Sequence, residues 1–146
     1  MRDARVEHRP QSTEPILHVK YRFQKHYTLD EARAYLPELR RLLREAQRRR
    51  VHLQQLDQKL GSQQEQTGGD LGGKDVGALV TEMTQLNAQI LSLQERGIEL
   101  KDLDRGLVDF PHLRDGREVF LCFELEDDDI EFWHEIEAGY AGRERL

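Results

Sequence analysis

Two helical patterns of matched length, separated by a glycine-rich break, constrain the fold more than any other feature of the sequence. Residues 28–60 carry apolar side chains at three-four spacing, and residues 75–96 carry a heptad seam of leucine, methionine and isoleucine. The break, residues 61–74, contains five glycines and has no periodicity. Beyond Pro37 each helix spans about 22 residues, or roughly 33 Å. The pattern therefore predicts an antiparallel coiled-coil hairpin, an arm with a flexible tip.

Local signals mark the ends of these helices. Thr28 followed by Glu31 is a capping box, in which the hydroxyl and the carboxylate each bind an amide of the first turn. Asp75 can cap the second helix, and Gly97 is a candidate C-cap glycine. Pro37 lies inside the first pattern. Because proline lacks an amide hydrogen and crowds the preceding turn, we predict a kink or a break there.

The chain before the first helix divides into two parts. Residues 1–15 are charged, contain two prolines and carry almost no large apolar residue, which is typical of a disordered extension. Residues 16–24 alternate strictly between apolar and polar side chains, which predicts a strand. This strand can complete a C-terminal sheet, so we expect residues 16–146 to form a single domain.

The stretch 97–146 predicts a small, mostly antiparallel sheet followed by a tail. Two alternating runs, residues 118–125 and 130–136, flank the acidic segment 126–129, as a hairpin with a four-residue loop would. An apolar run at residues 107–111 predicts a further strand. If the loop is symmetric, the pairs across the hairpin are Leu125 with Ile130, Phe123 with Phe132, Leu121 with His134 and Val119 with Ile136.

These patterns together predict an α+β fold, in which a long antiparallel helical hairpin is attached to a small, mostly antiparallel β-sheet. Charged residues make up 34% of the 146 residues and hydrophobic residues 37%. This balance fits an arm that exposes most of each helix.

Composition also limits the partners and the compartment. The net charge of -6 argues against a general nucleic-acid binder, for which a basic domain is expected. Arg40, Arg44 and Arg48 form a basic stripe, which we interpret as a solvated helix face paired with Glu38 and Glu45. No apolar run has the length of a membrane span. A single cysteine excludes an intramolecular disulfide and fits a reducing, cytoplasmic compartment.

His134 is the strongest candidate for chemistry. In the predicted register it is the polar residue on an otherwise apolar face, so a buried imidazole there needs a hydrogen-bond partner or a metal. Asp109, in the 107–111 run, is the candidate partner, since a buried carboxylate has to be paired. In this register Cys122 lies on the opposite face from His134. A shift by one residue would bring the two together.

The possible metal ligands are His134, Asp109, His112, Cys122 and Glu135. Their spacing matches no zinc pattern, and only their crowding into one short region supports the alternative of a single divalent ion. The sequence fixes no other cofactor. His112 belongs to the turn around Asp115-Gly116, where a solvated histidine is the simpler interpretation. For His134, too, a core histidine bound to a carbonyl or carboxylate is the simpler interpretation, and a ligand or acid–base role is the alternative.

Certain motifs of the chain also resemble those of a known family. They are GIELKDLDRGLVDFPHLRDGREVFLC followed by WHEIEAGYAGR, and the earlier YTLDEARAYLPELRRLL. On these motifs the chain resembles the bacterial family called domain of unknown function 2203, from about Tyr27 to the C-terminus. The resemblance implies an N-terminal helical part and a C-terminal block, and it brings no assigned activity.

Two functions remain open, and the sequence does not decide whether the protein is an enzyme. The first is a non-enzymatic, homo-oligomeric interaction protein, whose arms associate through a second apolar edge and whose sheet contacts an unidentified protein. The alternative is a divalent-metal-binding or metal-dependent protein that uses His134 and Asp109. We expect no membrane or nucleic-acid partner. The apolar edge comprises Leu42, Val51, Val80 and Leu91. The partner surface comprises Trp133, Tyr140 and Arg143. The Arg143 guanidinium, together with neighbouring glycine amides, could also hold an anion.

Overall fold

The structure is a computed structural model that describes residues 20–67 and 73–146. Two helices precede a five-stranded sheet along the chain. The helices are α1 (Leu29–Thr67) and α2 (Gly73–Glu95). The strands are β1 (Glu99–Asp102), β2 (Leu107–Arg114), β3 (Arg117–Phe123), β4 (Phe132–Glu135) and β5 (Glu144–Arg145), with a short 3-10 helix, η1 (Tyr140–Gly142), before β5.

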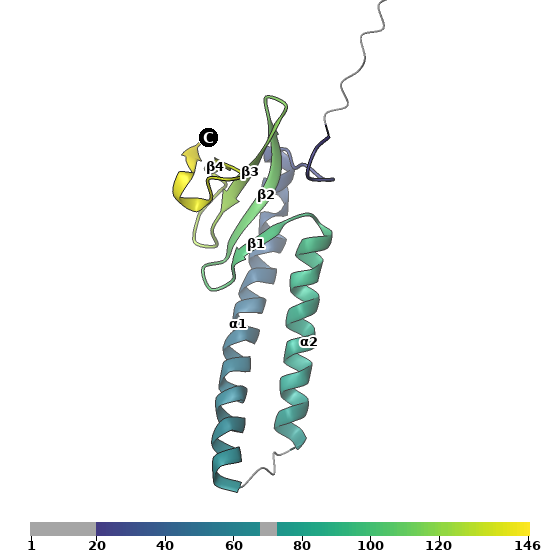
Figure 1. The fold of residues 1–146 in the computed structure, drawn as a ribbon, viewed down its shortest axis with the longest axis vertical. Coiled ribbons are helices and arrows are strands. Elements are labelled where there is room, and N and C mark those ends of the chain that lie inside the picture. Colours follow the sequence, from purple (N-terminus) through teal and green to yellow (C-terminus); the bar gives the residue numbers. More distant parts are fainter. Residues whose placement is uncertain (1–19, 68–72) are drawn as a thin grey trace, which may run out of the picture.

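The arrangement in space is a helical hairpin that carries the sheet near one end. Figure 1 shows α1 and α2 side by side and antiparallel, with the sheet against the N-terminal half of α1. Neighbouring strands are all antiparallel, in the order β1-β2-β3-β4-β5. The predicted α+β fold is confirmed. None of the described helices has both the length and the apolar character needed to cross a membrane.

Two predicted helix ends have the expected geometry. The amide of Glu31 donates to the Thr28 hydroxyl oxygen at 3.1 Å, and the amide of Thr28 donates to the Glu31 carboxylate at 3.3 Å. At the end of α2, Gly97 has a φ of 74°, and the Ile98 amide donates to the Leu93 carbonyl at 3.0 Å. Leu93 and Ile98 are both buried, so the turn also joins two core side chains.

At Pro37 the sequence predicts a kink or a break in the first helix. Helix α1 continues through the proline as one helix, so the break is wrong, and the kink stays a prediction. Leu36 and Leu39, on either side of the proline, are both buried in the core. Their packing opposes the intrinsic cost of about 3 kcal/mol for an interior proline, because a break would withdraw them from the sheet.

The two helices also extend further into the glycine-rich stretch than predicted. Residues 61–67 belong to α1 and residues 73–74 to α2, whereas residues 68–72 lie outside the described part. A single interior glycine costs a helix only about 1 kcal/mol, and the residues after Gly61 include good helix formers. Asp75 does not cap α2. Asp75 is the third residue of α2, and its carboxylate binds the Lys59 ammonium of α1 at 3.1 Å.

The structure describes residues 20–24 of the predicted strand 16–24, and these residues do not form a strand. The rest of the prediction, like the predicted disordered extension, lies outside the described residues. The amides of Arg22 and Phe23 donate to the carboxylate of Glu118 at 2.6 and 2.8 Å rather than to a neighbouring strand. The Phe23 ring packs on Phe120 at 5.3 Å between centroids. Side-chain contacts therefore replace the expected ladder.

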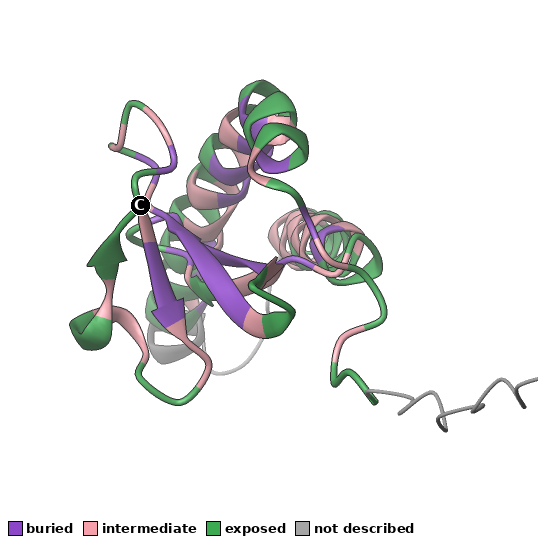
Figure 2. Ribbon diagram, turned by 90° about the horizontal axis from the view of Figure 1, so that it is seen from above, coloured by how far each residue is buried: buried purple, intermediate pink, exposed green. Residues whose placement is uncertain are grey.

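The core lies between α1 and one face of the sheet. Figure 2 shows that the central strands are buried along most of their length. Of the residues of α2, only Leu93 is buried. The two-residue turn between β2 and β3 has positive φ at both Asp115 and Gly116, as a type I′ hairpin requires. Large side chains of the core that are fully buried are Leu39, Leu43, Leu93, Ile98, Phe110, Leu121, Phe123 and Ile130.

One arginine of α1 ties the helix to the loop between β3 and β4, and its neighbour pairs within the helix. The Arg40 guanidinium donates to the carbonyls of Asp127 and Asp128 at 3.1 and 2.7 Å. Arg41 pairs with Glu45 at 2.9 Å. Part of the predicted basic stripe is therefore used within the chain rather than left for an external anion.

Candidate metal centre

The register of β3 and β4 differs by one residue from the predicted one. His134 pairs with Phe120 rather than with Leu121, and Cys122 pairs with Phe132. Apolar residues occupy both faces of β3, so the alternating pattern does not distinguish the two registers. The loop decides it, because Leu125 and Ile130 enter the core instead of pairing with each other.

A turn within the acidic run makes this loop possible. The Asp127 amide donates to the Glu124 carbonyl at 2.8 Å. The Glu124 amide donates to the Asp127 carboxylate at 3.0 Å. The turn replaces the symmetric four-residue loop of the prediction and shifts every pair that follows it.

The new register brings three candidate ligands together on the face of the sheet that points away from α1. Asp109 on β2 pairs with Cys122 on β3, and His134 on β4 lies beside them. The exposed fractions are 3% for Asp109, 2% for Cys122 and 2% for His134. One ligand atom from each residue lies within 4.8 Å of the other two. The expectation that Cys122 and His134 lie on opposite faces is wrong.

Hydrogen bonds orient the imidazole of His134. Its Nδ1 lies 2.8 Å from the backbone carbonyl oxygen of Glu135, and its Nε2 lies 3.0 Å from Oδ1 of Asp109. Because a carbonyl oxygen can only accept, Nδ1 carries a hydrogen and donates it. The predicted pairing of Asp109 with His134 is confirmed. The ring also has the arrangement common in metal-binding histidines, in which one nitrogen donates to a carbonyl and the other faces the ligand cluster.

Burial controls the protonation of the other two residues. It raises the pKa of Asp109 above its usual value, and the neighbouring His134 opposes that rise. Burial also raises the pKa of the Cys122 thiol to about 12, and the charge of Asp109 adds to the rise. A thiol held in its protonated form is a poor nucleophile, which argues against cysteine catalysis. A divalent cation would reverse this preference for the protonated forms, because it stabilises both the carboxylate and the thiolate.

A cavity of about 190 Å³ lies over the three residues. Gly139 lines it with a backbone conformation, φ 63° and ψ -167°, that is essentially restricted to glycine. The segment after β4 can therefore turn back over the sheet and cover the site. The cavity is lined by Asp109, Cys122 and His134 together with Lys101, Leu107, Phe120, Ile136, Gly139 and Tyr140.

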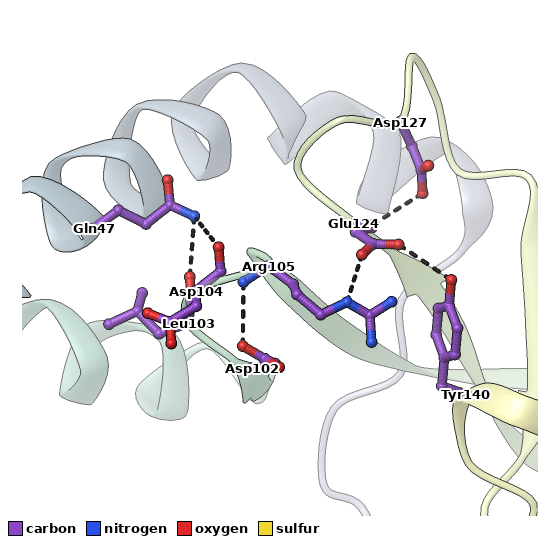
Figure 3. Close-up of polar contacts among 8 residues, drawn as sticks. All are labelled: Gln47, Asp102, Leu103, Asp104, Arg105, Glu124, Asp127 and Tyr140. Carbon is purple, nitrogen blue, oxygen red and sulfur yellow. Dashed lines mark hydrogen bonds and ion pairs between the residues drawn. The ribbon is translucent and has the colours of Figure 1, made fainter.

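A polar network fixes one wall of this cavity (Figure 3). The Tyr140 hydroxyl donates to the Glu124 carboxylate at 3.3 Å, and Arg105 binds the other oxygen of that carboxylate at 2.7 Å. The loop that carries Arg105 is held in turn by Gln47 of α1, whose side-chain amide donates to the Leu103 carbonyl at 3.0 Å. The wall is thus connected to the helical arm.

Two of the predicted metal ligands lie elsewhere. His112 is in β2 rather than in the turn, and its Nδ1 lies 2.6 Å from the Tyr27 carbonyl oxygen, on the face opposite Asp109. The side chain of Glu135 also points away from His134, and its carboxylate binds Arg117 at 2.6 Å. Strand alternation excludes both side chains from the cluster, because each is an odd number of residues from a cluster member on its own strand.

The residues predicted as a partner surface do not form one open surface. Trp133 is buried in the core, with only 7% of its surface exposed. Tyr140 lines the cavity, and the Arg143 guanidinium lies over the Tyr140 ring at 4.0 Å. Sequence reasoning missed Lys101 and Phe120 as residues that line the cavity, because the pairing of distant strands decides which side chains surround it.

The comparison with known families concerns the part of the chain that contains this site. A family model described as "Uncharacterized conserved protein (DUF2203)" matches residues 25–146. The chain belongs to this family. The match includes both helices, the whole sheet and all three residues of the DUF2203 candidate metal centre, and the family description assigns no function. Comparison with curated proteins and with solved structures finds no match to the chain.

Proposed function

We propose that this DUF2203 protein binds one zinc ion through Asp109, Cys122 and His134. The observation that carries the proposal is the convergence of three buried ligand-type side chains from three adjacent strands, with one ligand atom of each within 4.8 Å of the others. Sulfur and imidazole nitrogen favour zinc, whereas magnesium and calcium prefer sites made of oxygen atoms. A thiolate ligand stays reduced in the cytoplasm, which is the compartment we propose.

The number of protein ligands suggests the kind of zinc site. Structural zinc sites usually have four protein ligands, whereas catalytic sites have three and leave one position open. Here the three side chains form the floor of the cavity, so a fourth position would face a space that a small molecule can enter. Zinc in such a site supplies Lewis acidity and lowers the pKa of a bound water. The Glu135 carbonyl keeps the His134 ring in its orientation. The strand pairing of Asp109 with Cys122 keeps these two side chains next to each other.

Elemental analysis of untagged protein tests the proposal. We expect close to one zinc per chain in the wild type and a loss of zinc in the Cys122→Ala variant, with folding checked by circular dichroism. The matched control is His112→Ala, which removes a histidine of the same sheet from the opposite face. Zinc retained by Cys122→Ala, or no zinc in the wild type even after incubation with the metal, would show that the proposal is wrong.

We also propose that the helical arm mediates self-association, which is a separate function from metal binding. The supporting observation is a set of exposed apolar side chains on α2, with exposed fractions of 56% for Val80, 49% for Met83 and 52% for Leu91. Their spacing places them on one side of the helix. Leu42, predicted to belong to this edge, is buried in the core, and Val51 is exposed on α1.

Sedimentation analysis of the full chain tests self-association. A dimer should form in the wild type and dissociate in Met83→Glu, because a charge would be buried in an apolar contact. Thr81→Glu is the control, since Thr81 is exposed and lies on the other side of α2. A wild-type protein that is monomeric at the highest attainable concentration would contradict the proposal.

A further inference from the structure

The cavity over the candidate metal centre has room for a small molecule. Its volume of about 190 Å³ corresponds to roughly six water molecules at about 30 Å³ each. Leu107, Phe120 and Ile136 contribute apolar walls, and the ligand cluster forms the polar floor. A molecule that fits has only a few non-hydrogen atoms, with a polar end directed at the floor and a short apolar part against the walls.

The charges around the cavity indicate whether that molecule is an anion or a cation. A zinc ion bound by one carboxylate and one thiolate has no net charge, because the two anionic ligands balance the charge of the metal. The metal with its ligands therefore does not by itself select an anion. Lys101 lies on the cavity wall, but its ammonium is paired with Glu99 at 2.6 Å. A cation near the cavity that has no carboxylate partner would therefore make the cavity favour an anion.

Arg143 is such a cation. Its guanidinium lies 4.0 Å from the ring centroid of Tyr140, which lines the cavity, and 4.3 Å from that of Phe132, which pairs with Cys122. Within residues 20–67 and 73–146, no carboxylate forms an ion pair with Arg143. Arg143 does not itself line the cavity, but it stacks on Tyr140, which does, so the planar group is held beside the cavity wall while its N–H donors remain available.

We infer that the cavity binds a small aliphatic carboxylate, whose oxygen occupies the open position of the metal and whose charge is balanced by Arg143. This inference rests on the zinc site proposed above. A carboxylate suits the site better than a phosphate, because a phosphate presents at least three strong acceptor oxygens and the cavity walls are largely apolar. The short alkyl part contacts Phe120 and Ile136.

Cobalt substitution provides the test, because the visible absorption of bound Co²⁺ changes when its ligands change. Metal-free protein is loaded with Co²⁺ and then titrated with propionate and, separately, with inorganic phosphate. We expect propionate to change the spectrum and phosphate to have little effect. Arg143→Gln should weaken propionate binding about tenfold without changing the Co²⁺ content. Arg143→Lys, which keeps the charge, should restore part of the affinity.

Arg145→Gln is the matched control, since Arg145 is exposed and its guanidinium lies over the same Phe132 ring at 5.3 Å. Normal Co²⁺ binding with no response to propionate would overturn the carboxylate inference and leave the metal site standing. A stronger response to phosphate, or an Arg143→Gln variant that binds propionate like the wild type, would overturn it as well. Failure to bind Co²⁺ or zinc would instead overturn the metal site and the inference with it.

Discussion

Asp109 and Cys122 occupy directly paired positions on β2 and β3, so both side chains leave the sheet on the face away from α1. His134 joins them because it pairs with Phe120, two residues before Cys122 on the same face. A shift of β4 by one residue would turn His134 toward the core and leave Asp109 buried without its partner. The candidate site therefore depends on the register of a single hairpin.

Substitution of Asp109 should destabilise the metal-free protein. Asp109→Ala leaves the His134 imidazole buried without its partner, and we expect the free energy of unfolding to fall by about 3 kcal/mol. Urea denaturation in the presence of a chelator measures the change. In a double-mutant cycle, Asp109→Ala combined with His134→Ala should cost clearly less than the sum of the two single changes. Additive costs would mean that the two side chains do not interact.

Two glycines should respond in opposite ways to the same substitution. Gly97→Ala should destabilise the protein by about 1 kcal/mol, because φ is 74° there and alanine disfavours that region, although a Cβ would meet only Lys25 Cβ at 3.6 Å. Gly77→Ala, in the interior of α2 with open space around it, should stabilise by about 0.5–1 kcal/mol. Thermal melts of both variants beside the wild type would check the signs. Equal effects would mean that backbone conformation does not set the cost at Gly97.

Glu118 should make the attachment of the segment before α1 sensitive to acid. Burial alone would raise the pKa of Glu118, but hydrogen bonds from His26 and from the amides of Arg22 and Phe23 outweigh it and lower the pKa below its ordinary 4.5. A carboxyl whose pKa is lower in the folded state stabilises the fold above the ordinary value. That stabilisation is lost as pH falls below 4.5 toward the folded pKa.

The measurement is the free energy of unfolding of wild type and Glu118→Gln at a series of pH values. The difference between them should be largest near neutral pH and should shrink as pH falls through 4.5, because the wild-type carboxyl then becomes protonated. A difference that stays constant across this range would indicate that the charge of Glu118 does not hold the segment.

Local signals in the sequence were sufficient to predict two helix ends and one turn between strands. The capping box at Thr28, the C-cap at Gly97 and the Asp115-Gly116 turn each depend on a few adjacent residues, and each has the expected geometry. The pairing of Asp109 with His134 was also predictable, because a buried carboxylate and a buried imidazole in a small sheet have few other partners.

The composition of the candidate site could not be predicted, because it depends on contacts between distant segments. Alternation on β3 fits two registers equally well, and the choice follows from how Leu125 and Ile130 enter the core. Residues 16–24 alternate like a strand, yet the described part of this segment is held by Glu118, about a hundred positions away. No local pattern encodes a side chain that replaces a strand ladder.

Zinc should stabilise the folded chain only when the three-residue cluster is intact. A ligand that binds the native state and not the unfolded state adds RT ln(1 + [L]/Kd), or about 4 kcal/mol at a thousandfold excess over Kd. We therefore expect zinc to raise the melting temperature of metal-free wild type and of His112→Ala, and a chelator to reverse the rise. Cys122→Ala should not respond, because it lacks one of the three ligand atoms of the cluster. An equal rise in Cys122→Ala would place the zinc elsewhere on the chain, for instance on the exposed histidine of the arm, His52, beside Glu82.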